Sequence, residues 1–198
     1  MGCRSLNCAG RWRGCRHRFA ELRRAVEGLQ APGRRFDYRG TWHGRQVVDD
    51  YAHHPSEVDA TLATARLMVN SGRSTLPETP QRLLAIFQPH RYSRTAEFLE
   101  AFAQALTQAD AVILAPLYAA GEDPLPGISS AALAAAIGRL KPELPVAVTA
   151  SLEELTDAVV DRSQAGDLVL AMGAGDVNGL WSRLQQRQER STAVPLAA

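Results

Sequence analysis

The chain has 198 residues, of which 45% are hydrophobic, and a formal net charge of +1 at pH 7. This length and apolar content suffice for one well-packed domain with an appendage. The near-neutral charge gives no reason to expect nucleic acid or an acidic membrane surface as a partner, and no apolar run approaches the roughly 18–20 residues that a membrane-spanning helix needs.

The first 19 residues, MGCRSLNCAGRWRGCRHRF, carry many arginines and show no helical or strand period. They contain no continuous apolar segment, so we do not expect a secretory signal. The cysteines of the chain, Cys3, Cys8 and Cys15, all lie here at a spacing that fits neither a disulfide framework nor a standard zinc site. We expect residues 1–19 to be a poorly ordered leader, and this cysteine usage indicates a reducing, cytoplasmic location.

Residues 20–30, AELRRAVEGLQ, predict a short helix, which the following Ala-Pro-Gly ends. After it, RRFDYRGTWHGRQVVDDYA predicts two extended segments joined around Gly40 to Gly44. We therefore divide the chain into the leader, a helix and linker at 20–33, a main domain at 34–188 and a frayed tail at 189–198.

From residue 56 onward, helical and strand patterns alternate. We expect helices at 56–70, 95–108, 129–140, 151–165 and 176–190, and strands at 82–88, 110–118, 145–150 and 167–173. Within 95–108, Phe98, Phe102 and Leu106 recur at helical spacing. Short apolar strands separated by helices predict a three-layer α/β domain, in which helices cover both faces of a mostly parallel sheet.

Polar clusters follow four of the predicted strands: DDYAHHP (49–55), FQPHRYSRT (87–95), LYAAGEDP (117–124) and MGAGD (172–176). The carboxyl ends of parallel strands share one edge of a sheet, where ligands bind. The sequence therefore predicts that these clusters line one rim. The alternative is that they are ordinary polar loops between strands and helices.

In the first cluster, Asp49 and Asp50 sit where a carboxylate can accept a hydrogen bond from a ribose hydroxyl or bind a cation, and His53 can donate to a carboxylate or phosphate. Two other interpretations stay open: a metal site, and histidines that merely cap a turn. Adjacent histidines without an i,i+4 partner or a cysteine disfavour the metal site.

In the second cluster, Arg91 and Arg94 precede a predicted helix, an arrangement that suits an anion because guanidinium groups bind carboxylate and phosphate bidentately. A solvated basic turn is the alternative. Glu122 of the third cluster is expected to pair with one of these arginines. The GAGD segment lacks the third glycine of a dinucleotide fingerprint, so we interpret it as a tight turn beneath the rim.

Taken together, the motifs resemble the C-terminal domain of the Mur ligases, the ATP-dependent amide-bond ligases of peptidoglycan synthesis. The resemblance covers residues 20–185 and rests on GRRFDYRG, VVDDYAHHPSEV, IFQPHRYSRT, LYAAGEDPLPG and MGAGD, in the family's order. It is greatest to the branch that joins L-alanine to UDP-N-acetylmuramate. The branch that recycles a tripeptide onto the same sugar nucleotide is the second interpretation, because its counterpart of HRYSRT looks different.

The resemblance implies a Rossmann-like domain that closes over the site of a three-domain enzyme. Its partners would be L-alanine, ATP or ADP, and UDP-N-acetylmuramate, with Mg²⁺ and the ATP phosphates held by a central domain. In that chemistry the sugar nucleotide's carboxylate attacks the γ-phosphate, and the alanine amine displaces phosphate from the acyl phosphate. The resemblance assigns nucleotide binding to Arg34, Arg35 and Asp49, and binding of L-alanine and the acyl phosphate to Tyr51, His53, Arg91 and Arg94. It assigns no catalytic residue and no metal ligand.

One departure from the family concerns lysine. A phosphate-binding loop of the form GxxxxGK[ST] needs a lysine, and the single lysine, Lys141, lies in RLKPEL. We expect residues 20–30 to be a remnant of the central domain, the chain to be an isolated or truncated unit without tightly bound cofactor, and the chain alone to be inactive. The rival from another class is a non-catalytic module that binds a nucleotide or amino acid. A hydrolase is disfavoured because no GxSxG motif occurs.

Overall fold

Six short segments form the strands of one sheet, and the central ones are apolar. The computed structural model describes residues 33–192, and in this part of the chain the strands are β1 (Asp37–Trp42), β2 (Arg45–Asp50), β3 (Arg82–Phe87), β4 (Ala111–Leu114), β5 (Val146–Val148) and β6 (Asp167–Met172). The strand order is β1-β2-β6-β3-β4-β5. β1 runs antiparallel to β2, and every other neighbouring pair is parallel. The predicted α/β fold with a mostly parallel sheet is confirmed.

The described part of the chain also contains six α-helices, and serine side chains cap the start of two of them. They are α2 (Pro55–Ser71), α3 (Tyr92–Glu97), α4 (Leu99–Leu106), α5 (Ser130–Leu140), α6 (Leu152–Arg162) and α7 (Leu180–Thr192), preceded by the 3₁₀ turn η1 (Asp176–Gly179). The Ser129 hydroxyl accepts the N–H of Ala132 at the start of α5, and the Ser151 hydroxyl accepts that of Glu154 at the start of α6. These N-caps fix where each helix leaves the sheet.

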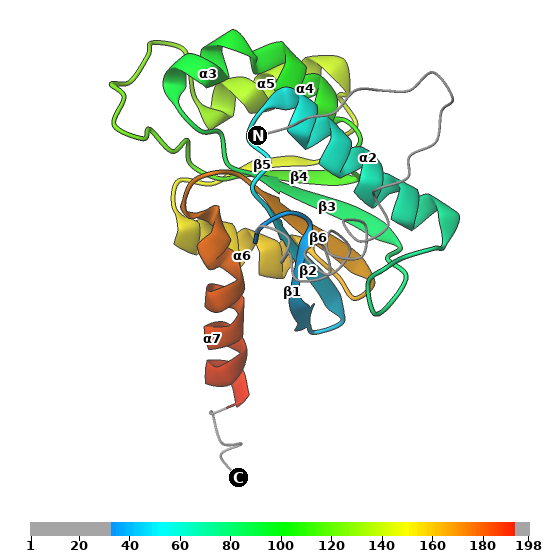
Figure 1. Ribbon diagram of the computed structural model, residues 1–198. Coiled ribbons are helices and arrows are strands. Elements are labelled where there is room, and N and C mark those ends of the chain that lie inside the picture. Colours follow the sequence, from blue (N-terminus) through cyan, green and yellow to red (C-terminus); the bar gives the residue numbers. More distant parts are fainter. Residues whose placement is uncertain (1–32, 193–198) are drawn as a thin grey trace, which may run out of the picture. The chain divides into compact units, whose positions relative to one another are not determined.

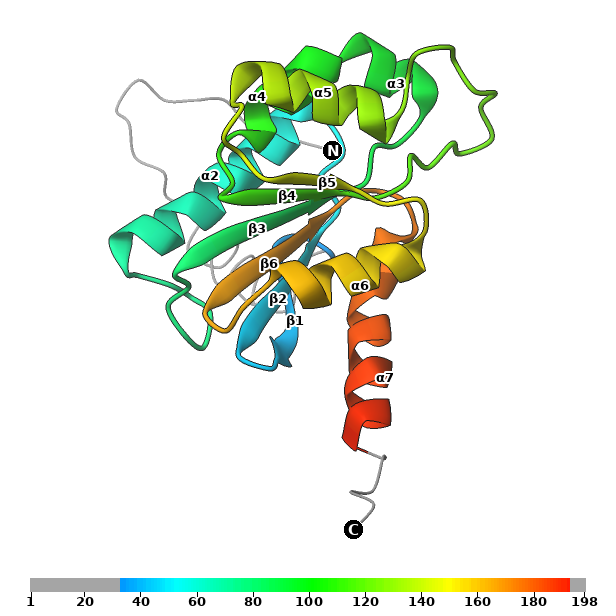
Figure 2. The same ribbon diagram turned by 180° about the vertical axis from the view of Figure 1, so that it is seen from behind.

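Alternating strand residues build two cores, one on each face of the sheet. In β3, Leu83, Ala85 and Phe87 pack beneath α2, α4 and α5, while Leu84 and Ile86 pack against α6 and the start of α7. Figures 1 and 2 show α2 to α5 on one side of the sheet and α6 and α7 on the other. Because both faces are covered, the central strands are apolar throughout rather than alternating.

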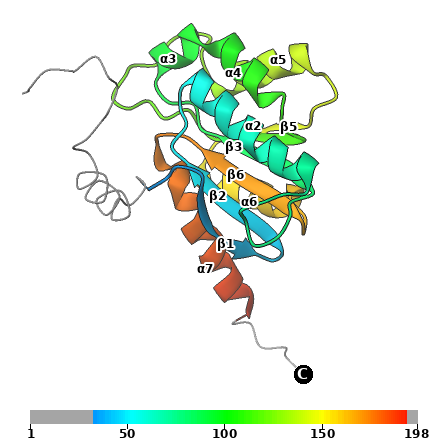
Figure 3. The same cartoon turned by 45° about the vertical axis from the view of Figure 1, so that its right-hand side comes forward.

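The first turn of α7 packs against the edge strand β1, and Figure 3 shows the two side by side. Gly40 makes this contact possible. A Cβ on Gly40 would lie 2.5 Å from the Trp181 ring, and the residue has φ +149°. A side chain at position 40 would therefore push the indole off the strand.

Several boundaries differ from those predicted. The helix expected at 95–108 is divided at Phe98, whose φ of −116° breaks the regular spiral where its ring packs 4.9 Å from that of His54. The strand expected at 110–118 ends at Leu114, because Pro116 follows and the chain turns to form the rim. Helix α7 continues to Thr192, into the segment expected to fray. The predictions for residues 1–19, for the helix at 20–30 and for 193–198 lie outside the described residues.

Candidate functional site

The four polar clusters meet at one edge of the sheet. The registers pair Asp50 with Met172, Met172 with Phe87, and Phe87 with Leu114, so β2, β6, β3 and β4 all end at the same level. Backbone hydrogen bonds continue across the loops beyond, including the Gly173 N–H to the Asp50 carbonyl at 3.1 Å. The predicted rim at the carboxyl ends of the strands is confirmed.

At the end of β2, the two aspartates have different surroundings. The Asp50 carboxylate accepts the backbone N–H groups of Ala52 and Phe36, both at 2.7 Å, and thus shapes the loop. The Asp49 carboxylate accepts from Arg34 at 3.0 Å through Oδ2. Burial raises the pKa of Asp49, against the lowering effect of the Arg34 charge and hydrogen bond. Of the two acids that the sequence indicated for a ribose or a cation, Asp50 is thus already committed to the backbone.

Arg34 links the first and fourth clusters. Besides its bond to Asp49, its Nη2 donates to the Gly173 carbonyl at 2.7 Å, and its guanidinium lies 4.9 Å from the centre of the Tyr51 ring. The neighbouring Arg35 is half exposed and lies 3.8 Å from Glu57. The predicted nucleotide-binding residues thus differ: Arg34 is fixed in the rim, whereas Arg35 reaches solvent.

The adjacent histidines point to different neighbours. His53 Nδ1 lies 2.8 Å from the Tyr51 carbonyl, and because a carbonyl only accepts, this nitrogen carries a proton. His54 lies just before α2, and its ring is instead near Ser56 in the first turn of that helix and near the ring of Phe98. Glu57 accepts the backbone N–H of both histidines; these bonds lower its pKa, although desolvation by burial opposes them as the largest single effect. His54 therefore belongs to the helix cap, whereas His53 faces the rim.

His90 lies at the centre of the rim, and the sequence interpretation did not single it out. Its ring is stacked on Tyr118 at 5.6 Å between centroids, lies 5.9 Å from the ring of His53, and places Nδ1 at 3.3 Å from Nη1 of Arg94. Through these contacts, Tyr51, His53 and Arg94 belong to one continuous cluster, because the Tyr51 and His53 rings are themselves 5.0 Å apart.

Arg91 has an unusual backbone conformation, with φ 68° and ψ 137°. This combination lies outside the regions that non-glycine residues ordinarily adopt. Its N–H donates to the Tyr118 carbonyl at 2.8 Å, and its carbonyl accepts from the Thr95 N–H and hydroxyl. Strained backbone held by such bonds is typical of functional sites.

Residues of the third and fourth clusters make hydrogen bonds that hold the rim loops in place. Glu122 does not pair with an arginine, as the sequence suggested, but accepts from the N–H and hydroxyl of Ser93 at 2.9 and 2.6 Å, because Ser93 lies at the exposed start of α3. The amide of Gln88, which is 2% exposed, donates to Asp176 and accepts from Val177 N–H. A Cβ on Gly175 would come 2.4 Å from the same amide, so GAGD is a tight turn, as predicted.

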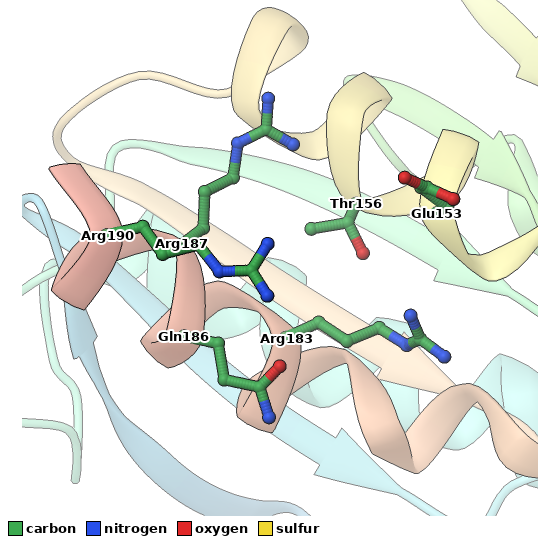
Figure 4. Close-up of a pocket in the computed structure, with 6 residues that line it drawn as sticks. All are labelled: Glu153, Thr156, Arg183, Gln186, Arg187 and Arg190. Carbon is green, nitrogen blue, oxygen red and sulfur yellow. The ribbon is translucent and has the colours of Figure 1, made fainter.

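The surface hollows lie beside the rim or away from it. A groove of about 450 Å³, lined partly by Tyr92, Leu117 and Thr149, opens next to the ends of β4 and β5. A second one, of about 420 Å³, lies between α6 and α7, where Arg183, Arg187 and Arg190 face Glu153 and Thr156 (Figure 4). This second groove contains none of the predicted site residues.

Two further observations concern metals and membranes. Within residues 33–192 no group of three or more His, Cys, Asp or Glu side chains is arranged to hold a metal ion. No helix in the same span has the length and apolarity required to cross a bilayer.

Comparison with known proteins gives consistent matches. Residues 34–175 match the family described as "Mur ligase, glutamate ligase domain". The chain is 62% identical over 181 residues to UDP-N-acetylmuramate–L-alanine ligase of Synechococcus sp. (strain CC9605), covering 90% of this chain and 39% of that protein. It is 66% identical over 162 residues to the protein of the same name from Synechococcus sp. (strain CC9311), covering 82% and 34%.

Among solved structures, the fold resembles that of UDP-N-acetylmuramate–alanine ligase from Thermotoga maritima, with a TM-score of 0.63 and 24% identity. The match covers 88% of this chain and 36% of that one. At this identity the likeness supports the fold alone. The chain spans only 39% and 34% of the length of the two curated relatives it matches.

Proposed function

The chain belongs to the Mur ligase family, and from this premise we propose that it is the amino-acid- and nucleotide-contacting C-terminal domain of an ATP-dependent ligase that joins L-alanine to UDP-N-acetylmuramate. The observation that carries the proposal is the convergence of Arg94, His90, His53 and Tyr51 on one sheet edge. The high identity to relatives named for that reaction supports the choice of substrates.

Arg91 and Arg94 would bind the carboxylate of L-alanine and the acyl phosphate, because guanidinium groups pair bidentately with both anions. His53, with its Nδ1 proton committed to the Tyr51 carbonyl, would direct Nε2 toward the ligand. Tyr51 would close the pocket wall beside it. None of these groups needs to form a covalent bond; their work is to orient and to balance charge.

The residues proposed for the nucleotide fit that group. Oδ1 of Asp49 is buried and accepts no hydrogen bond from a residue in the described part of the chain, so a ribose hydroxyl would satisfy it. Arg35 is half exposed and has donors to spare for a phosphate. ATP would supply the phosphate that activates the sugar nucleotide's carboxylate, and both Mg²⁺ and a cytoplasmic location remain parts of this proposal.

A hybrid enzyme tests the proposal. Residues 34–198 would replace the matching segment of the Synechococcus sp. (strain CC9605) ligase, and phosphate release would be measured with UDP-N-acetylmuramate and L-alanine. We expect turnover that needs both substrates, and Arg91→Gln and Arg94→Gln should each raise KM for L-alanine by about 10- to 100-fold, since each removes a charge-assisted hydrogen bond.

The control is Arg73→Gln, which changes an exposed arginine in the loop after α2 and should leave KM unchanged. Turnover that is independent of L-alanine, or faster with the tripeptide L-alanyl-γ-D-glutamyl-diaminopimelate, would contradict the proposed substrate. The 198-residue chain by itself is expected to show no alanine-dependent ATP hydrolysis, since its one lysine lies outside any GxxxxGK[ST] motif.

A further inference from the structure

His90 and Arg94 make a contact whose chemistry determines the protonation of the histidine. Nη1 of Arg94 lies 3.3 Å from Nδ1 of His90. A guanidinium group has donors and no acceptor. Nδ1 of His90 must therefore present its lone pair, and the ring proton must sit on Nε2.

The two rim histidines thus have opposite tautomers. Nδ1 of His53 carries a proton because it faces the Tyr51 carbonyl, whereas Nδ1 of His90 carries none. The rings lie edge to face with centroids 5.9 Å apart. Stacking on Tyr118 with an interplanar angle of 11° fixes the plane of the His90 ring, and with it the direction of the lone pair.

We propose that His90 is a positioning residue: its neutral imidazole, held by Tyr118, orients the Arg94 guanidinium toward the mouth of the site, and protonation of His90 releases it. A second proton on His90 would occupy Nδ1 and leave Arg94 facing a cation instead of an acceptor. What Arg94 then binds rests on the proposed function; the orientation itself does not.

The surroundings of His90 favour the neutral ring. Burial is the main cause that lowers the pKa of His90, and the electrostatic influence of Arg94, His53 and Arg91 lowers it further. Glu122 is the one group with the opposite effect, and it is engaged by Ser93. The geometry at Nδ1 and the charge of the neighbourhood therefore agree that His90 is neutral at pH 7.

Two substitutions separate orientation from packing. In His90→Asn the side-chain oxygen takes the place of Nδ1 and accepts a hydrogen bond at any pH. In His90→Phe the ring can still stack on Tyr118, but no acceptor remains. Both should fold like the unaltered chain, which the amide NMR spectrum and the thermal midpoint would establish.

The measurement is the order parameter of the Arg94 Nε–H bond by NMR in the 198-residue chain from pH 5 to 8. In the unaltered chain we expect a value near the rigid limit of about 0.85 at pH 8, falling below about 0.6 as the His90 Cε1 resonance titrates. His90→Asn should stay ordered throughout, and His90→Phe should be disordered at pH 8. The proposal would be overturned if the Arg94 Nε–H bond stayed ordered in His90→Phe, or if its order parameter did not change as His90 titrates.

The hybrid enzyme then distinguishes this inference from the proposed function. If both are right, His90→Phe raises KM for L-alanine by roughly five- to tenfold, the loss expected when a bound group is no longer pre-oriented. The change in kcat is smaller. In His90→Asn the KM for L-alanine returns to that of the unaltered hybrid. If the NMR result holds but KM does not respond, Arg94 is positioned as argued and the assignment of L-alanine to it is wrong.

Discussion

Nε of Arg34 donates to Oδ2 of Asp49 at 3.0 Å, and this bond ties the residues before β1 to the end of β2. The same guanidinium reaches the Gly173 carbonyl beyond β6. The Asp49 side chain is 6% exposed and that of Arg34 21%, so the pair is largely removed from water.

Replacing Arg34 by methionine should destabilise the domain, because a buried carboxylate would lose its counter-charge. We expect a loss of about 2 kcal/mol in the free energy of unfolding, below the ~3–5 kcal/mol for a fully buried pair. The matched control is Arg39→Met, which breaks the exposed Arg39–Asp37 pair and should cost less than about 0.5 kcal/mol. Equal losses in urea denaturation would refute the argument.

Arg91→Gly should separate stability from ligand binding. Glycine adopts a φ of 68° without strain and retains the N–H that Tyr118 accepts, so we expect the domain to gain about 1 kcal/mol. Arg94→Gly lies inside α3 and should instead lose about 1 kcal/mol. Thermal unfolding compares the two, and in the hybrid enzyme both variants should raise KM for L-alanine. A destabilised Arg91→Gly would mean that the backbone at position 91 is unstrained.

Gly175→Ala should loosen the rim. The new methyl would lie 2.4 Å from the Gln88 amide oxygen and 2.8 Å from the Tyr118 ring, and displacing either should cost about 1–3 kcal/mol. Gly179→Ala, four residues on, meets no atom within 4 Å and should leave stability unchanged or slightly raised. Chemical denaturation measures the free energy of unfolding of the two variants. Comparable values would show that the loop around Gly175 accommodates the methyl group without cost.

The pH dependence of stability should change in Asp167→Asn. Asp167 is fully buried, and burial raises its pKa despite hydrogen bonding from Gln164 and the charge of Arg82. The folded state therefore keeps this proton to a higher pH than the unfolded state, and the contribution of Asp167 to stability falls as pH rises from about 3.8 through the raised pKa. Asparagine cannot ionise. The free energy of unfolding of Asp167→Asn, relative to that of the unaltered chain, should therefore improve over that interval. Parallel stability curves between pH 3.5 and 7 would contradict this.

The sheet and its rim could be predicted because their signals are local. Leu83 to Phe87 form a continuous apolar run bounded by polar residues, and such runs mark strands buried on both faces. The strand ends then locate the rim without any knowledge of contacts, which is why Tyr51, His53, Arg91 and Arg94 could be grouped in advance.

The arrangement within the rim could not be predicted, because it depends on contacts between distant segments. Nothing in the sequence around Asp50 indicates that its carboxylate binds the N–H of Phe36, nor that Asp49 is the one paired with Arg34. His90 adjoins Arg91, but nothing in the local sequence marks it, because its importance comes from Tyr118 and His53 across the loops. The break at Phe98 likewise reflects packing on His54 rather than helix propensity.

The strand order has a consequence for synthesis on the ribosome. β6, which emerges last among the strands, lies between β2 and β3 and is hydrogen-bonded to both. Until β6 leaves the exit tunnel, the nascent chain has the hairpin of β1 and β2 and a separate piece made of β3, β4 and β5. The strand that joins these two pieces, β6, is still missing. Assembly of the complete sheet is therefore expected to wait for β6, and a chain that lacked β6 would have two halves with unpaired edges.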